Sequence, residues 1–226
     1  MKIFRNAIVA GAFAVLLALP FFGGPAVVNV GAQTAATKVA YAPIPGGDYK
    51  LDPAHSLIGF AVRHLEINWV GGRFKEFEGT VHYDEKDVTK SSVEFSAKVA
   101  SVDTEVEARD KHLRTADFFE VEKYPTMIFK STRVERKGKD AFVLHGDLTL
   151  KGVTKPVALP FTLKGAVKDP WGNTRIGVDA ETKINRRDFG INYGNAFAGG
   201  GLDVGNEVTI SLRLEAVKPG PKPAGR

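Results

Sequence analysis

The densest group of side chains that could do chemistry lies between residues 109 and 114, where Arg109, Asp110, His112 and Arg114 stand close together. Asp110 and His112 could act as the acid–base pair of a lipid hydrolase. An arginine could instead bind a ligand phosphate or carboxylate, because its planar guanidinium matches those groups. In the structural interpretation, ion pairs of Asp110 with Arg109 or Arg114 hold this segment onto the fold, since buried charge must be paired.

A second basic cluster, Arg186-Arg187, opens a glycine-rich loop that we expect over residues 185–206. His64 shares strand parity with Phe60 and Val62, so its imidazole would lie at the end of an apolar face. It could equally be a histidine that is hydrogen-bonded at the end of the fold. We assign the following residues to the polar head of a ligand: His64, Arg109, His112, Arg186 and Arg187.

Other chemistry has little support in the sequence. No Gly-x-Ser-x-Gly motif is present, and the five histidines show neither His-x-His nor His-x-x-x-His spacing. We therefore predict no catalytic residues and no metal site. The lack of cysteine argues against a disulfide scaffold and thiol chemistry. The net charge of +5 is spread without a basic stripe, so nucleic acid is not an expected partner.

The elements that position these residues are mainly β-strands. From about residue 48, apolar and polar residues alternate with period two, as in Val93, Phe95, Ala97 and Val99. We expect about eight long antiparallel strands, with one of the turns at Gly71-Gly72. Few long strands joined by short turns favour a closed up-and-down barrel over a sandwich, because each apolar face must be hidden.

One segment, from about residue 103 to 119, interrupts the strand pattern. Thr104 and Glu107 have the spacing of a capping box, which predicts a helix that begins there. Thr115 could cap a second short turn that brings Phe118 and Phe119 to the barrel end as an aromatic wedge. We expect one short helical insert that closes or lines one end of the barrel.

A barrel of about eight strands can hold one small ligand. Glycines among the large inward residues could leave part of the lumen unfilled. The alternative is a solidly packed barrel, that is, a purely structural envelope protein, because each of these side chains is more often ordinary core. The predicted tunnel lining is Ile58, Phe60, Val62, Phe95, Phe118, Phe119, Phe142, Leu144, Phe161, Ile176 and Val178.

The N-terminus resembles a targeting segment. Lys2 and Arg5 form a basic n-region, residues 3–22 are almost wholly apolar, and Val30-Gly31-Ala32 fits a small-residue cleavage site. An uncleaved anchor is the alternative, although Pro20 and the glycines after it break the run. We expect a signal peptide over residues 1–32, a disordered leader over 33–47, one barrel domain over 48–217 and a disordered tail over 218–226. Because an exported chain without cysteine suits a bacterial periplasm or cell envelope, we expect the mature protein in the periplasm.

Several motifs, in a fixed order, carry a family resemblance over about residues 48–217. They are Leu51-Asp52-Pro53-Ala54-His55-Ser56, Arg63-His64, Gly72-Arg73-Phe74, Arg109-Asp110-Lys111-His112-Leu113-Arg114, Asp117-Phe118-Phe119, Tyr124-Pro125-Thr126, the run from Gly146 to Thr154, and Arg187-Asp188-Phe189-Gly190. In these the chain resembles the YceI-like family of polyisoprenoid-binding periplasmic proteins.

The resemblance implies a lipocalin-like antiparallel barrel whose apolar tunnel holds a long-chain isoprenoid, of the polyprenyl or quinone type, or a similar amphipathic lipid. It implies a carrier without enzymatic activity, and no cofactor other than a bound lipid or quinone. Such a carrier could also make transient contact with a membrane surface, and it could form a homodimer.

Overall fold

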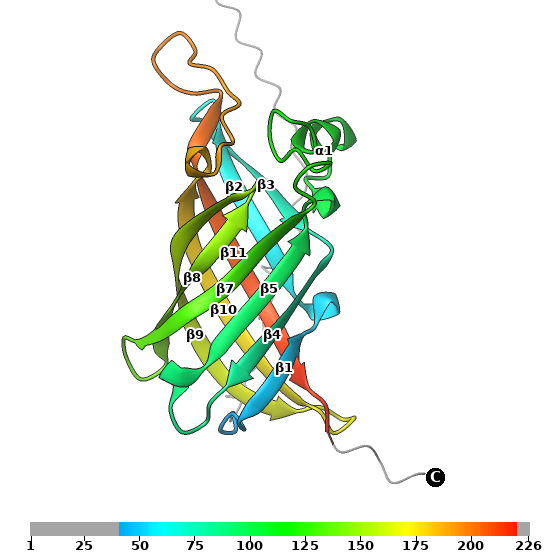
Figure 1. Ribbon diagram of the computed structural model, residues 1–226, viewed down its shortest axis with the longest axis vertical. Helices are drawn as coiled ribbons and strands as arrows, with labels where there is room; N and C mark the ends of the chain where they lie inside the picture. Colours follow the sequence, from blue (N-terminus) through cyan, green and yellow to red (C-terminus); the bar gives the residue numbers. More distant parts are fainter. Residues whose placement is uncertain (1–40, 221–226) are drawn as a thin grey trace, which may run out of the picture. The chain divides into compact units, whose positions relative to one another are not determined.

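A computed structural model describes residues 41–220 of the 226-residue chain. These residues form an all-β barrel with one α-helix, which confirms the predicted fold class (Figure 1). The strands are β1 (Gly47–Leu51), β2 (Leu57–His64), β3 (Asn68–Phe74), β4 (Phe77–Tyr83), β5 (Ser92–Lys98), β6 (Val102–Asp103), β7 (Thr126–Arg136), β8 (Ala141–Leu150), β9 (Val153–Lys168), β10 (Thr174–Asn185) and β11 (Val204–Lys218). The helix is α1 (Glu107–Leu113), and short 3-10 turns are η1 (Pro53–His55), η2 (Val88–Lys90), η3 (Val99–Ser101) and η4 (Arg186–Phe189).

The strands close into an antiparallel ring in sequence order. β1 and β2 pair in turn with β11, so they act as one long strand that η1 interrupts. Pro53 supports this interruption, because proline has no N–H to donate to the ladder, and Asp52 caps the turn by accepting from the Ala54 N–H at 3.0 Å. β3 and β4 pair with β2 and β1 in the same way. The result is the expected up-and-down barrel of eight long strands.

The turn between β2 and β3 lies at residues 64–67, so the expected turn at Gly71-Gly72 is wrong. The Ile67 N–H donates to the His64 carbonyl at 3.1 Å, and Leu65 and Glu66 have φ of 50° and 59°. Gly72 lies inside β3 because the Phe60 ring packs against it: a Cβ there would lie 2.5 Å from the ring. The glycine pair therefore makes room for a side chain and does not form the turn.

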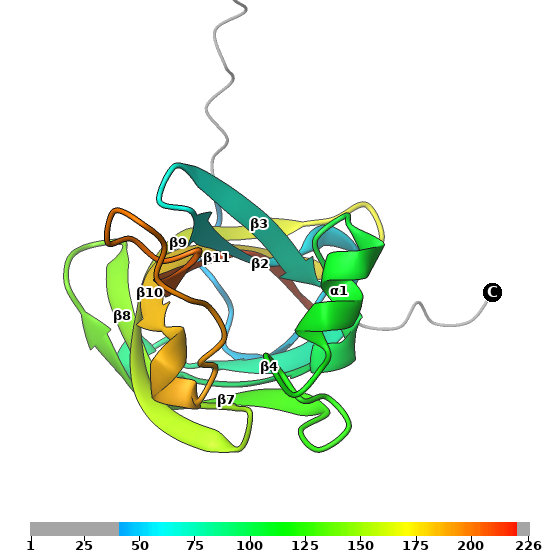
Figure 2. The same cartoon turned by 90° about the horizontal axis from the view of Figure 1, so that it is seen from above.

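The end of the barrel opposite α1 is covered by residues that we expected to belong to a disordered leader. The Ala42 N–H and carbonyl pair with Ala166 of β9 at 2.9 and 3.0 Å, along an edge that β8 does not reach. Seen through the barrel from the α1 end, the following segment crosses this far end before it enters β1 (Figure 2). Tyr49 is fully buried beneath it, and its hydroxyl donates to the Pro45 carbonyl at 2.6 Å. The expected signal peptide lies outside the described residues, as does most of the leader.

Two clusters of buried apolar side chains fill the inward faces of the strands. The larger one includes Phe74, Val99, Phe129 and Leu148, and the smaller one surrounds Tyr49 near the covered end. No helix among residues 41–220 is long and apolar enough to cross a membrane.

Candidate functional site: an apolar cavity inside the barrel

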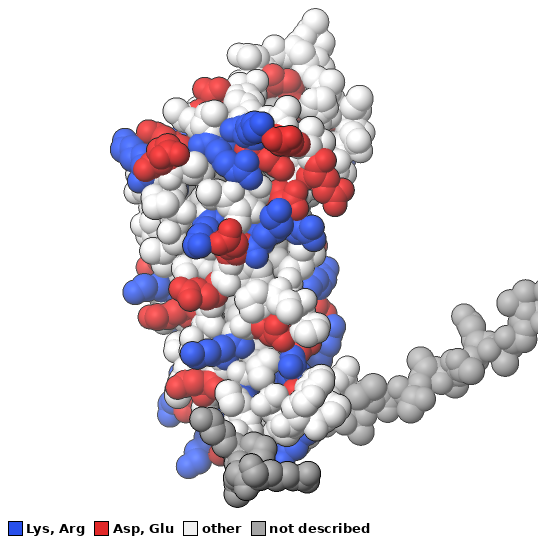
Figure 3. Space-filling model, turned by 90° about the vertical axis from the view of Figure 1, so that its right-hand side faces the viewer, with Lys and Arg blue, Asp and Glu red and all other residues white. Residues whose placement is uncertain are grey.

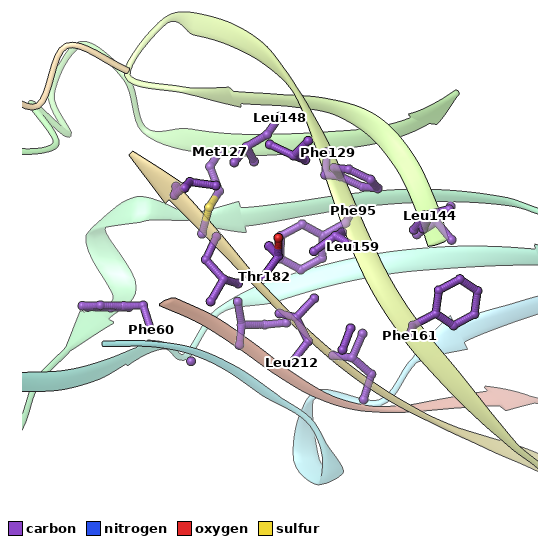
Figure 4. Close-up of a pocket in the computed structure, with 18 of the residues that line it drawn as sticks. Phe60, Phe95, Met127, Phe129, Leu144, Leu148, Leu159, Phe161, Thr182 and Leu212 are labelled. Atoms are coloured by element: carbon purple, nitrogen blue, oxygen red, sulfur yellow. The ribbon is translucent and has the colours of Figure 1, made fainter. Parts of the chain in front are cut away.

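The barrel encloses a cavity of about 260 Å³ between these clusters. Side chains from nearly every strand point into it, among them Phe95, Leu159 and Leu212, which face one another in Figure 4. The lining extends from Val62, Phe118 and Ile191 near α1 to Val88 and Ser91 near the opposite end. The barrel is therefore not packed solid along its axis.

Ten of the eleven predicted lining residues border this cavity, whereas Phe142 does not. Phe142 is buried, with its ring stacked on Phe161 at 5.4 Å and the Arg136 guanidinium 4.9 Å from its centre. Phe142 is the cross-strand neighbour of Phe161, and its ring packs between Phe161 and Arg136 and not against the cavity. The contact of these residues with a ligand stays a prediction. Those that border the cavity are Ile58, Phe60, Val62, Phe95, Phe118, Phe119, Leu144, Phe161, Ile176 and Val178.

Sequence reasoning left many lining residues out of the predicted set. The alternation of β11 carries the signal for Val208, Ile210, Leu212 and Leu214. The pattern of β7 is less regular because its register shifts between Ser131 and Arg133. Met127 and Phe129 precede this shift, and they were missed because the exposed Ile128 between them hides the alternation.

Polar side chains at the cavity are few. The Thr182 hydroxyl donates to the Ala158 carbonyl at 2.8 Å, and the Ser91 hydroxyl accepts from the Asp84 N–H at 3.0 Å. Burial raises the pKa of Tyr83, so its phenol stays protonated. A hydrocarbon chain would thus meet an interior almost free of unsatisfied polar groups.

Arg186 is the one charged side chain among the residues that line the cavity, and it is only 4 % exposed. Its Nε donates to the Gly205 carbonyl at 2.8 Å, its Nη1 to the Ile191 carbonyl at 2.8 Å and its Nη2 to the Val204 carbonyl at 2.9 Å. Burial lowers its pKa, and the neighbouring Arg187 lowers it further. Within residues 41–220 it forms no ion pair with a carboxylate. Three carbonyl dipoles hold this positive charge at the α1 end of the cavity.

The other predicted headgroup residues do not border the cavity. His64 is exposed at the end of β2, and the Arg187 Nε donates to the Asn206 side chain at 2.6 Å. Arg109 donates to both the hydroxyl and the carbonyl of Thr104 at 2.7 Å. The His112 Nε2 lies 2.8 Å from Asp117, and its ring packs edge-on against Phe118 and Tyr193.

The capping box expected at Thr104 is wrong. Helix α1 begins at Glu107 with Val106 as an N-cap that makes no side-chain hydrogen bond. Thr104 is buried, and its N–H and hydroxyl both donate to Asp110, at 2.9 and 2.6 Å. Because burial turns Thr104 toward the barrel, its side chain cannot cap the helix.

The ion pairs expected within this insert are also absent from the described residues. The carboxylate of Asp110 is engaged by Thr104, and Arg114 donates to the carbonyls of Ala100 and Val102 at 2.8 and 2.9 Å. Hydrogen bonds to backbone and hydroxyl groups hold the insert in place. Asp110 and His112 have different partners, so they do not form the acid–base pair that a hydrolase would need.

One group of possible metal ligands lies outside the cavity, formed by Asp52, His55 and Glu215. The Arg175 Nη1 donates to Asp52 at 2.8 Å and also to Glu215, and its Nε donates to Asp169 at 2.8 Å. A guanidinium thus already supplies the positive charge that these carboxylates require. The cluster ties the β10–β11 region to the residues before η1.

The model of the YceI-like domain matches residues 49–216 of the chain. A YceI protein of Escherichia coli O157:H7 is 47% identical over 146 residues, which cover 64% of this chain and 76% of the relative. A UPF0312 protein of Photorhabdus laumondii is 46% identical over 144 residues, covering 63% and 74%.

Solved structures have the same fold. The crystal structure of Burkholderia cenocepacia BcnA superposes with a TM-score of 0.63 at 24% identity, covering 73% of this chain and 98% of BcnA. A polyisoprenoid binding domain from Saccharophagus degradans superposes with a TM-score of 0.58 at 17% identity, covering 76% and 98%.

Proposed function

Because the chain belongs to the YceI-like family, we propose that its barrel binds a long-chain isoprenoid, of the polyprenyl or quinone type, or a similar amphipathic lipid. In this proposal the protein carries or sequesters the lipid in the periplasm and catalyses no reaction. Residues 1–32 would act as the signal peptide that exports it.

The observation that carries the proposal is the apolar cavity along the barrel. On β11 the lining runs from Val208 to Ala216, which at a rise of about 3.3 Å per residue is a distance of about 26 Å. Each methylene moved from water into such a lining contributes about 0.8 kcal/mol. A lining this long and this apolar therefore suits a hydrocarbon chain better than a compact polar metabolite.

Arg186 supports an amphipathic ligand. Its charge is buried at one end of the cavity and is balanced by carbonyl groups alone. A phosphate, carboxylate or quinone oxygen at that end would complete its coordination. In the proposed complex the polar head lies beside Arg186 and the chain extends toward Val88.

The test is native mass spectrometry of the full chain, with and without added polyprenol, on two matched variants. Ala180 is buried and borders the cavity, whereas Ala158 lies exposed on the outer face of neighbouring β9. Ala180→Phe should fill the lumen and abolish lipid binding, whereas Ala158→Phe should bind lipid as the wild type does. Circular dichroism would confirm that both variants fold. Failure of the wild-type protein to take up polyprenol or a quinone, or uptake that Ala180→Phe leaves unchanged, would contradict the proposal.

A further inference from the structure

The α1 end of the barrel exposes large apolar side chains that folding does not explain. Ile67 is 79 % exposed in the β2–β3 turn, and Leu65 and Trp69 are exposed on either side of it. Tyr193 and Phe197 are exposed in the loop between η4 and β11. We call these five residues the apolar rim.

The rim is one contiguous surface, because the turn and the loop are joined. The Leu65 N–H donates to the Asp203 carbonyl at 3.0 Å. The Phe197 ring packs over Gly201, and a Cβ on Gly201 would lie 3.1 Å from the Glu66 side chain. The rim also adjoins the cavity, since Tyr193 packs at 4.6 Å on Phe118, which borders it.

The backbone of the turn gives an independent sign that Leu65 is there for a reason other than folding. Leu65 and Glu66 occupy the two central positions of a turn in which both residues have positive φ. Asn-Gly or Asp-Gly is strongly preferred at such positions, because a side chain with a Cβ is disfavoured there. A branched apolar residue that is both strained and exposed gains nothing from the fold itself.

The loop part of the rim is uncharged, and Glu66 of the turn is the one carboxylate between its apolar side chains. Residues 189–202 contain no charged side chain. Figure 3 shows basic and acidic side chains interspersed over the barrel wall, and an uncharged tip at the end that carries this loop in Figure 1. Arg63 stacks on Trp69 at 4.6 Å, a position from which its long side chain can reach toward lipid headgroups.

We propose that the apolar rim docks the protein on the surface of a lipid bilayer, so that the α1 end of the cavity faces the membrane. The proposal rests on the proposed function, because a long hydrocarbon ligand resides in a bilayer and would enter from there. Trp and Tyr are the residues favoured at the membrane–water interface. A stable protein partner would need about 20–30 residues on each side, many more than the rim offers.

The two tryptophans of the chain allow a local test, because they lie at opposite ends of the barrel. Trp171, in the β9–β10 turn, is 77 % exposed and serves as the matched control for Trp69. The probe is vesicles of phosphatidylcholine with brominated acyl chains, added to the full chain with one tryptophan replaced. In Trp171→Phe the fluorescence of Trp69 should shift to the blue and be quenched. In Trp69→Phe the fluorescence of Trp171 should not change.

Vesicle flotation then measures the contribution of the rim. Ile67→Ser combined with Phe197→Ser should lower the partition onto vesicles at least tenfold, whereas Trp171→Ser should leave it unchanged. All of these side chains are exposed, so unfolding midpoints should stay the same. Equal quenching of both tryptophans, no quenching of either, or equal partition of the two variants would overturn the proposal, as would a Trp69 shift that depends on protein concentration without vesicles.

Delivering polyprenol from cyclodextrin separates this proposal from the proposed function, because that route needs no bilayer. Wild type and the rim variant should load equally from cyclodextrin, whereas the rim variant should load at least tenfold more slowly from vesicles. Equal loading from both sources would contradict docking and leave the cavity function standing. Loading of neither protein from cyclodextrin would refute the cavity function, while the tryptophan quenching would still decide on docking.

Discussion

Arginine is used in two different ways at the two ends of this barrel. Arg186 is buried beside the cavity and donates only to carbonyls, so its charge is solvated by the backbone of the loop before β11. Arg175 forms ion pairs with Asp52, Asp169 and Glu215 and so links separate segments of the chain at the end opposite α1. The first arrangement leaves a positive charge open to a ligand, whereas the second consumes it.

Replacing Arg186 should loosen the whole loop. Arg186→Met would leave three buried carbonyls without donors, and we expect the free energy of unfolding to fall by about 3 kcal/mol. Arg186→Lys should lose less, because one ammonium group keeps the charge but cannot reach all three acceptors. Denaturant unfolding would measure both. Unfolding midpoints within error of the wild type would show that these hydrogen bonds do not hold the loop.

Asp169 should make stability depend on acidic pH. Burial alone would raise its pKa, but hydrogen bonds from Arg175, Asn173 and the Trp171 N–H outweigh this effect and lower the pKa from 3.8 to about 2. A carboxyl with a lowered pKa stabilises the fold fully above its unfolded pKa, and this contribution is lost as the pH falls from about 4 to 2. Denaturant midpoints over this range should fall less steeply for Asp169→Asn than for the wild type. Parallel pH profiles of the two proteins would contradict this prediction.

Glycine decides how the strands pack against aromatic side chains. Gly72 of β3 lies under the Phe60 ring, and Gly146 of β8 lies under the Phe129 ring. In both cases the ring occupies the space that a side chain at the glycine position would fill. These two contacts bring rings from adjacent strands close to the barrel wall, and both rings border the cavity.

Gly146→Ala should therefore be destabilising. The new Cβ would lie 2.4 Å from the Phe129 ring and 2.5 Å from the Lys130 carbonyl, and overpacking of this kind costs about 1–3 kcal/mol. Gly177→Ala is the matched control, because Gly177 also lies in a strand but has no atom within 4 Å of the position of its Cβ. Thermal unfolding would compare the two. A loss at position 177 as large as that at 146 would rule out the ring contact as the cause.

One end of the barrel is covered, and the other end carries the apolar rim. At one end Ala42 pairs with Ala166 of β9 and the Pro45 carbonyl accepts from Tyr49, and at the other end lie α1 and the loop after η4. A lipid would have to enter where side chains from separate segments meet, as Phe118 and Tyr193 do. The path of the ligand is thus a property of the whole barrel and of no single element.

Bound lipid should stabilise the whole barrel, because a ligand that binds only the folded state adds its binding free energy to folding. At a lipid concentration about 100 times Kd this is roughly 2.7 kcal/mol, or about 5–10 °C in Tm for a chain of this size. Removing co-purified lipid should lower Tm by this amount, and reloading polyprenol should restore it. Ala180→Phe should show no change in Tm on the same treatment. A Tm that is insensitive to lipid in the wild type would argue against an occupied cavity.

The sequence alone determined the barrel and part of the lining of its cavity. Period-two alternation fixes which side chains share a face, so ten of the eleven chosen residues border the cavity. The ring of eight strands follows from the number and length of the alternating runs. Local patterns determine these features because side chains two residues apart on a strand point to the same face of the sheet.

The tertiary structure alone decided the partners of the polar residues. Thr104 bonds with Asp110 because burial turns both inward, although the local pattern predicts a helix cap. Of the five residues chosen for a headgroup, only Arg186 reaches the cavity, since η4 directs it inward while Arg187 points to Asn206. Hydrogen-bond partners and the direction of long side chains depend on contacts between distant segments, which the spacing of residues along a chain does not contain.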